Sequence, residues 1–196
     1  MNLRKTAIFL IAGAAVGSFL AMSQAMAQNE QFIPRLVYRT GPYAPNGVPF
    51  ADGYADYLDM LNARDGGIDG VKLVYEECED GYDTSKGVEC YERLKGKGPT
   101  GAALVDPLST GITYALIERA ANDKIPVISM GYGRADATYG AVFPYTFTYP
   151  VTYWEGADAM VTYIAQQEGG VAKLAGKKIA LAIGPNDKAE MTNSSK

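Results

Sequence analysis

The chain has 196 residues, of which 47% are hydrophobic and 20% charged, the composition of an ordinary globular protein and not of a disordered or fibrous one. Its formal net charge is -4 and it has no block of basic residues, so it lacks the electrostatic footprint of a nucleic-acid-binding protein. It contains no histidine, which excludes Ser-His-Asp and Cys-His nucleophiles and any metal site with a histidine ligand. We expect no metal, no cofactor and no nucleic-acid partner.

Residues 1–27 have the three parts of a cleavable export signal. Arg4 and Lys5 precede an apolar run, and the segment ends in the small-residue sequence Ala25-Met26-Ala27. The alternative is a membrane-anchoring helix, but glycines interrupt the run and it is shorter than the about 20 residues that a span requires. We predict cleavage after Ala27 and a mature chain outside the cytoplasm.

From Arg35 onward, short β-rich runs alternate with helical periods, which is the pattern of βαβ units and a parallel sheet. The first predicted elements are a strand at 35–40, a loop of turn-forming residues at 41–47, a helix with an apolar stripe from Phe50 to about Asp65, a strand at 72–76 and a helix at 84–94.

Cys78 and Cys90 are the only cysteines, and the predicted export takes them to an oxidising compartment, where thiol pairs usually form disulfides. Two buried free thiols are the alternative. Acidic residues surround Cys78 in the sequence and indicate an exposed position, so we predict a disulfide between the two cysteines.

The alternation continues to the end of the chain. The remaining predicted elements are a doubly buried strand at 102–105, a helix at 109–122, a strand at 125–129, a glycine-rich loop at 131–134, a strand at 143–149, a helix at 151–167, a strand at 178–183 and a polar tail at 184–196. In the helix at 151–167 we expect the apolar side chains of Trp154, Ala157, Met160, Val161 and Ile164 to face inward. The predicted fold class is α/β, an open parallel sheet with helices on both faces in the flavodoxin-like strand order.

Four segments carry a family resemblance: Thr40-Gly-Pro-Tyr-Ala-Pro-Asn-Gly47, the stretch 62–70, Ser109-Thr110 at a helix start, and the strand 125–129 before its glycine loop. Over residues 35–183 the chain resembles the type I periplasmic solute-binding proteins of the branched-chain amino-acid group. The resemblance implies a first lobe at 34–149, the start of a second lobe at 150–183, and a small amino acid held between the lobes. It also implies a periplasmic location and delivery of the ligand to the membrane subunits of an ABC importer, without enzymatic activity.

Ligands of open parallel sheets bind beyond the carboxyl ends of the strands, which places the expected site in three loops. The candidate ligand-binding residues are Tyr43, Leu108, Ser109, Thr110, Gly131, Tyr132, Gly133 and Arg134. The start of the helix near Ser109 would attract a carboxylate, although Ser109 also suits a simple helix cap. For Tyr43 and Tyr132 the alternative to ligand contact is ordinary packing within a turn. Gly133 stands where the family has a threonine, which leaves room for another small acid paired with Arg134.

The second lobe of the family continues beyond the equivalent of residue 183, so we expect a product truncated early in that lobe and weak ligand binding. Two other functions stay open. One is an exported enzyme with an acid pair among Asp52, Asp56, Glu76 and Glu118, although solvated surfaces explain these carboxylates more simply. The other is a partner-binding module that uses the tyrosines at 139, 145, 149 and 153.

Overall fold

The computed structural model describes residues 29–130, 135–178 and 180. The predicted export signal, the glycine-rich loop at 131–134 and the polar tail at 184–196 lie outside the described residues. Within the described ranges, no helix combines the length and the apolar character needed to cross a membrane.

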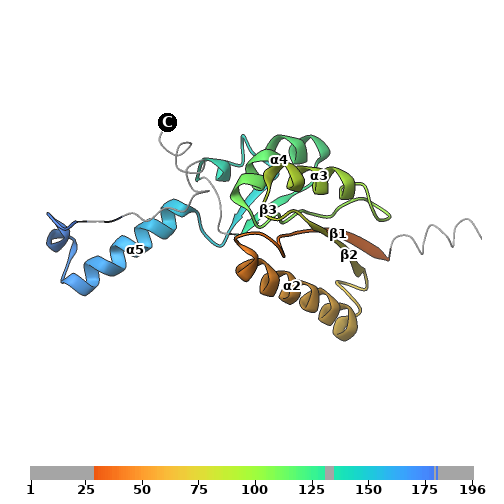
Figure 1. The fold of residues 1–196 in the computed structure, drawn as a ribbon, viewed down its shortest axis with the longest axis horizontal. Helices are drawn as coiled ribbons and strands as arrows, with labels where there is room; N and C mark the ends of the chain where they lie inside the picture. Colours follow the sequence, from red (N-terminus) through yellow and green to blue (C-terminus); the bar gives the residue numbers. More distant parts are fainter. Residues whose placement is uncertain (1–28, 131–134, 179, 181–196) are drawn as a thin grey trace, which may run out of the picture.

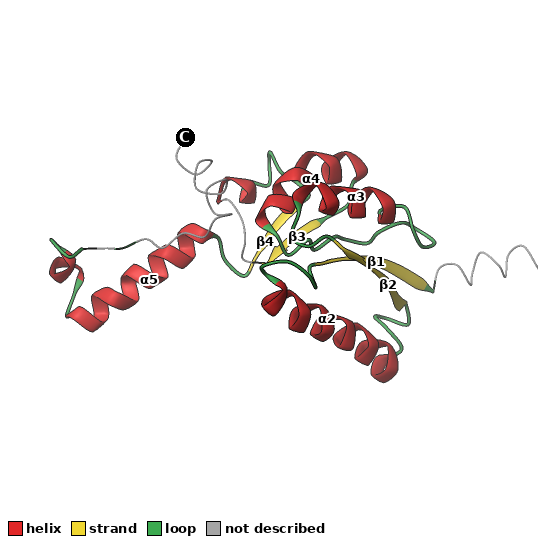
Figure 2. Cartoon of the chain, viewed as in Figure 1, coloured by secondary structure: helices red, strands yellow, loops and turns green. Residues whose placement is uncertain are grey.

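Strands and helices alternate along the chain, as predicted (Figures 1 and 2). In chain order the elements are β1 (Glu30–Val37), α2 (Ala44–Asp65), β2 (Lys72–Glu79), α3 (Thr84–Leu94), α4 (Thr110–Asp123), β3 (Val127–Met130), the 3-10 helix η1 (Ala135–Thr138), β4 (Thr146–Tyr149), α5 (Tyr153–Glu168) and the 3-10 helix η2 (Val171–Leu174).

The strands form a parallel sheet in the order β2, β1, segment 102–106, β3, β4. β1 pairs with β2 and β3 pairs with β4, both in parallel. Isolated parallel bridges join segment 102–106 to β1, at Phe32–Ala102 and Arg35–Asp106, and to β3, at Val105–Val127. This is the flavodoxin-like order that the sequence predicts. The strand order reverses between β1 and segment 102–106, and at such a switch point the following loops diverge to opposite faces and leave a crevice.

Helices cover both faces of the sheet, α2 on one side and α3 with α4 on the other (Figure 1). The larger core lies between the sheet and the α3–α4 side, and its fully buried members include Leu94, Val105, Ile112, Leu116 and Val127. A smaller cluster of Ile33, Leu58 and Leu73 lies under α2. Burial of these apolar side chains is the main force that holds the helices to the sheet.

A disulfide joins Cys78 on β2 to Cys90 on α3, with 5.7 Å between their Cα atoms. Both cysteines are buried, with exposed fractions of 8% and 3%. The acidic neighbours of Cys78 therefore do not place its side chain in water, because alternate residues of a strand point to opposite faces. The bridge ties α3 to the outer strand of the sheet.

Several predicted boundaries are wrong. β1 covers Glu30–Val37 and not 35–40, because pairing with β2 begins at Glu30. Helix α2 begins at Ala44, inside the segment predicted as a loop, since proline is compatible with the first turn of a helix. Segment 102–105 makes isolated bridges and no continuous ladder. Lys178 and Ala180, the described residues of the predicted last strand, are not in a strand.

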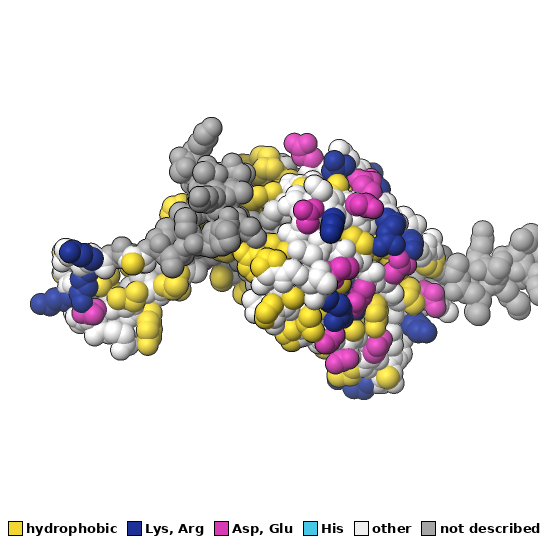
Figure 3. All heavy atoms as spheres, viewed as in Figure 1, with side chains coloured by type: hydrophobic (Ala, Val, Ile, Leu, Met, Phe, Trp, Pro, Cys, Tyr) yellow, Lys and Arg dark blue, Asp and Glu magenta, His cyan; other side chains and the backbone are white. Residues whose placement is uncertain are grey.

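The prediction for α5 is also wrong. Its expected inward residues are exposed, including Trp154 at 67% and Met160 at 63%, and Ala165 is the only buried residue of this helix. The helix extends away from the lobe in Figure 1, and apolar side chains show on its surface in Figure 3. An amphipathic period identifies an apolar face, but among the described residues no element covers it here.

Candidate functional site

The structure brings two of the three expected loops to one edge of the sheet. Tyr43 follows β1, and Leu108, Ser109 and Thr110 follow segment 102–106, its parallel neighbour. The carboxyl ends of adjacent parallel strands lie at the same edge, and here that edge is the switch point of the sheet. The third loop, Gly131, Tyr132, Gly133 and Arg134, follows β3 but lies outside the described residues.

Ser109 is the N-cap of α4. Its backbone is extended, and its Oγ accepts a hydrogen bond from the N–H of Ile112 at 3.4 Å. Its carbonyl oxygen accepts from the N–H of Thr113 at 2.9 Å and from the Thr113 hydroxyl at 2.8 Å. The first N–H groups of a helix, here those of Thr110 and Gly111, have no partner within the helix and carry its positive dipole end. The capping role expected as the alternative for Ser109 is therefore present, and the donors that α4 itself does not use belong to the backbone of Thr110 and Gly111.

Thr110 connects the lobe to α5. Its side chain is fully buried, and its Oγ1 lies 2.9 Å from the hydroxyl oxygen of Tyr153, the first residue of α5. Thr152 caps the same helix by accepting from the N–H of Glu155, whose carboxylate accepts in return from the N–H of Thr152. The start of α5 is therefore anchored beside the start of α4.

Leu108 has a positive φ of 51° although it is not glycine, and its side chain is buried. This left-handed conformation costs a side chain of this kind about 1–2 kcal/mol. Its N–H donates to a carboxylate oxygen of Asp106 at 3.3 Å, a contact that helps to hold the turn. The turn connects the end of segment 102–106 to the start of α4.

Tyr43 belongs to an aromatic cluster at the end of β1. Its ring centroid lies 4.3 Å from that of Tyr82, and the Tyr82 ring meets the Tyr38 ring edge-on at 5.0 Å. The Tyr43 side chain is half-buried. These contacts are the ordinary turn packing that was the alternative role for Tyr43. They also fix the position of its ring at the sheet edge.

Asp106 also lies at this edge, and it is not among the predicted ligand-binding residues. It is 9% exposed, and burial raises the pKa of its carboxyl to about 7. It lines a pocket together with Pro49, Phe50, Gly53, Tyr54 and Tyr57 of α2. The available signal was its position, an acidic residue directly after the apolar run 102–105 and three residues before a predicted helix cap.

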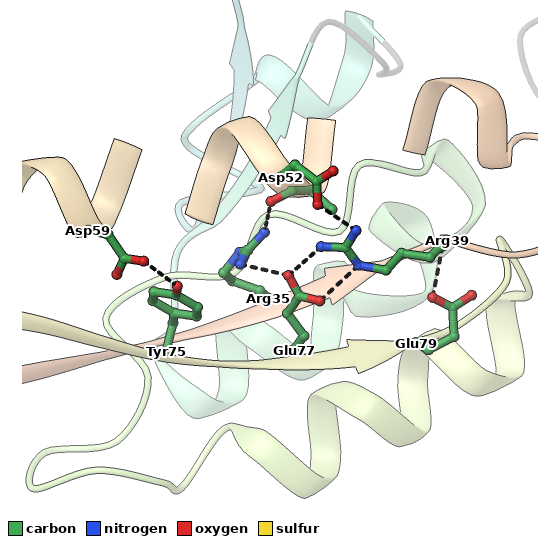
Figure 4. Close-up of polar contacts among 8 residues, drawn as sticks. Arg35, Arg39, Asp52, Asp59, Tyr75, Glu77 and Glu79 are labelled. Carbon is green, nitrogen blue, oxygen red and sulfur yellow. Dashed lines mark hydrogen bonds and ion pairs between the residues drawn. The ribbon is translucent and has the colours of Figure 1, made fainter. Parts of the chain in front are cut away.

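A buried arginine fixes α2 on the sheet (Figure 4). Arg35 of β1 is 1% exposed, forms an ion pair with Glu77 at 2.8 Å and donates to the carbonyl oxygen of Ala51. Its guanidinium lies 5.1 Å from the ring centre of Tyr54 and 4.9 Å from that of Tyr75. Such charge and cation–π contacts are strongest where water is excluded. They hold α2, and with it one wall of the pocket, at a fixed distance from the sheet.

Two of the four carboxylates considered for an enzymatic acid pair, Asp52 and Glu76, form ion pairs with basic side chains. Asp52 pairs with Arg39 at 2.7 Å, and the same arginine contacts Glu77 at 2.9 Å. Glu76 pairs with Lys97 at 2.6 Å, and the hydrogen bond from Lys97 lowers the pKa of this carboxyl. A carboxyl with a lowered pKa is a poor general acid at neutral pH. Across the part of the chain that the structure describes, no three acidic or cysteine side chains are grouped to hold a metal ion.

Comparisons with known proteins agree with this fold. A family model of periplasmic binding proteins matches residues 30–190. No curated protein sequence matches the chain. A solved structure from the Pseudomonas fluorescens group, described as an ABC transporter permease, is 45% identical, with a TM-score of 0.75 over 85% of this chain and 41% of that one.

Two more distant structures share the fold. A branched-chain amino-acid ABC transporter protein from Thermus thermophilus, with bound valine, is 20% identical with a TM-score of 0.67, over 85% of this chain and 42% of that one. A solute-binding protein of an ABC transporter from R. palustris, in complex with 4-hydroxybenzoate, is 13% identical with a TM-score of 0.55, over 71% of this chain and 36% of that one. The chain spans less than half the length of each of these proteins. The family match over 30–190 and the parallel α/β lobe together show that this chain belongs to the periplasmic binding protein family.

Proposed function

We propose that this chain is the substrate-binding component of an ABC importer and binds a branched-chain or related small amino acid outside the cytoplasm. In this proposal residues 34–149 form the first lobe and 150–183 begin the second. The observation that carries the proposal is the position of the α4 N-terminus, at the switch point of the sheet and beside the loop that follows β1. The predicted export signal and the family both support a periplasmic location.

The chemistry of this edge suits a carboxylate. The N–H groups of Thr110 and Gly111 would donate hydrogen bonds to the ligand carboxylate, and the positive end of the α4 dipole would stabilise its charge. The Ser109 hydroxyl would add a further donor. The ring of Tyr43 would form an apolar wall from the neighbouring loop. Residues 131–134 would approach from the end of β3, where Arg134 offers a second cation.

The proposal assigns transport and not catalysis. Periplasmic binding proteins hold a solute for transfer, and the ion pairs of Asp52 and Glu76 argue against an acid pair at this site. The contact between Thr110 and Tyr153 supports a hinge-like link between the two lobes, since it joins the ligand rim to α5. The partners would be the membrane subunits of the importer.

A second candidate ligand is another small carboxylic acid. The solved relative from R. palustris holds 4-hydroxybenzoate and the one from Thermus thermophilus holds valine, and a carboxylate is the group these ligands share. The same helix N-terminus would receive either ligand. Residue 133 is glycine, whereas the family resemblance implies a threonine there, and this difference is a reason to test small acids other than amino acids.

Isothermal titration calorimetry with leucine, valine and 4-hydroxybenzoate tests this proposal. Ser109→Gly removes the hydroxyl while glycine still serves as an N-cap, and we expect it to weaken binding by about tenfold, the usual effect of one hydrogen bond to a charged group. The matched control is Asp83→Gly, which changes the N-cap of α3 beside the outer strand β2 and should leave binding unchanged. A folded chain that gives no heat with any of these solutes would contradict the proposal.

A further inference from the structure

A pocket on the α2 side of the sheet edge has Asp106 in its lining. Its other walls are Pro49, Phe50, Gly53, Tyr54 and Tyr57, all from α2. The pocket is therefore apolar apart from the Asp106 carboxyl and the tyrosine hydroxyls. Tyr57 is 56% exposed and stands at the solvent side, while Asp106 is buried. This arrangement is not part of the carboxylate site described above.

The charge of Asp106 has no counter-ion among the described residues. Its neighbour in register, Arg35, is directed to Glu77 and to the carbonyl oxygen of Ala51. The bond that Asp106 accepts from the N–H of Leu108 is long, at 3.3 Å. A buried carboxylate that accepts one weak hydrogen bond is stabilised when a cation binds next to it.

The walls of the pocket also favour a cation. The faces of aromatic rings attract ammonium groups, and this attraction increases where water is excluded. Phe50, Tyr54 and Tyr57 line the pocket together with Asp106, and the Arg35 guanidinium already lies 5.1 Å from the centre of the Tyr54 ring. The chemical complement of the Phe50 and Tyr57 rings and a buried carboxylate is an ammonium group on an apolar body.

We propose that this pocket is an ammonium-binding subsite in which Asp106 is the counter-ion of the ligand. The inference rests on the proposed function and specifies it. The contact between Asp106 and the N–H of Leu108 places the carboxyl one turn of chain before the α4 N-terminus. An amino acid would then place its carboxylate at α4 and its ammonium group at Asp106, with its side chain against the rings of α2.

Three related probes separate the two charges of the ligand. Leucine carries both, isopentylamine is leucine without the carboxylate, and isocaproate is leucine without the ammonium group. We expect Asp106→Asn to weaken the binding of leucine and isopentylamine by about tenfold or more, the effect of losing a hydrogen bond to a charged group. Isocaproate binding should change by less than about twofold, because isocaproate has no ammonium group that could interact with Asp106.

Asp80→Asn is the matched control. Asp80 is also buried at the end of a strand and also accepts an N–H from the residue two positions on, but it is not among the residues that line the pocket. We expect this variant to bind all three probes like the parent chain. Circular dichroism melting checks that each variant folds. Tyr57→Ala, at an exposed wall, is the second variant and should weaken isopentylamine binding severalfold.

The outcomes distinguish this inference from the proposed function. If leucine and isocaproate bind and Asp106→Asn changes neither leucine nor isopentylamine affinity, the subsite is wrong and the carboxylate site stands. If isopentylamine binds through Asp106 while leucine and isocaproate do not bind, the subsite stands and the amino-acid assignment is wrong. If the folded parent chain binds none of the probes, both are wrong.

Discussion

Asp80 and Asp106 occupy similar local positions, Asp80 directly after β2 and Asp106 at the end of segment 102–106, with β1 between these two parts of the sheet. Each carboxylate accepts an N–H from the residue two positions on, from Tyr82 at 2.7 Å and from Leu108 at 3.3 Å. Burial raises the pKa of both carboxyls to about 7. The folded chain therefore binds a proton at these groups more tightly than the unfolded chain does.

This difference predicts how stability depends on pH. A raised pKa means that the folded state loses stability as pH rises from the unfolded value near 3.8 to about 7. Replacement of either aspartate by asparagine removes that loss. We expect Asp80→Asn and Asp106→Asn each to gain stability relative to the parent, on the order of 2 kcal/mol more at pH 8 than at pH 4.

Urea unfolding at the two pH values measures this gain. The control is Asp52→Asn, since Asp52 is exposed and paired with Arg39 and should show no such gain at high pH. A difference between parent and buried-site variants that does not change with pH would show that these carboxyls titrate as they do in the unfolded chain.

Residue roles were readable from the sequence only where the chemistry is local. Ser109 precedes an apolar helical period, so its cap was predictable, and its Oγ indeed accepts from the N–H of Ile112. Asp106 was not identified, because acidic residues are usually solvated and its burial depends on register with β1 and on packing under α2. Those two relations join segments that are far apart in the chain.

At the scale of elements, the contact between α3 and α4 depends on a glycine. A Cβ atom at Gly87 would lie 2.4 Å from Cδ1 and 2.6 Å from Cγ1 of Ile112, which is fully buried and has no room to move. We expect Gly87→Ala to destabilise the chain by about 1–3 kcal/mol through overpacking. Denaturant unfolding measures the change.

Gly53→Ala is the matched helical control for this prediction. A Cβ at Gly53 meets nothing within 4 Å, so alanine should stabilise α2 by about 0.5–1 kcal/mol through its better helix propensity. If Gly87→Ala were stabilising to the same extent, Gly87 of α3 and Ile112 of α4 would be farther apart than the structure shows.

Element types were more predictable than element limits. The helix at 84–94 was predicted at the residues where α3 lies, because its apolar residues recur at helical spacing. β1 begins at Glu30, five residues before its predicted start, because Glu30 and Gln31 are polar and Pro34 interrupts the local pattern, and the segment is a strand through its pairing with β2. Pairing is a long-range property that the local pattern does not contain.

At the scale of the whole molecule, the strand order was predictable and the position of α5 was not. Alternating strands and helices allow few arrangements, since crossovers between parallel strands are right-handed and sequential elements lie close together. The flavodoxin-like order follows from these constraints. The apolar face of α5 shows equally well in the sequence, but its burial requires a covering element, and none of the described elements provides one.

This uneven burial predicts an uneven distribution of stability. Leu116 is fully buried between α4 and the sheet, whereas Met160 on α5 is 63% exposed. Leu116→Ala should cost about 2–5 kcal/mol, because it removes apolar contact and leaves a cavity, and Met160→Ala should cost less than about 0.5 kcal/mol. Chemical denaturation of both variants measures the two costs, and native-state hydrogen exchange should find the amides of α5 less protected than those of α4.

Equal costs for the two substitutions would mean that α5 packs as part of the lobe. A small cost for Met160→Ala would instead agree with an α5 anchored at its first turn, where Thr110 meets Tyr153.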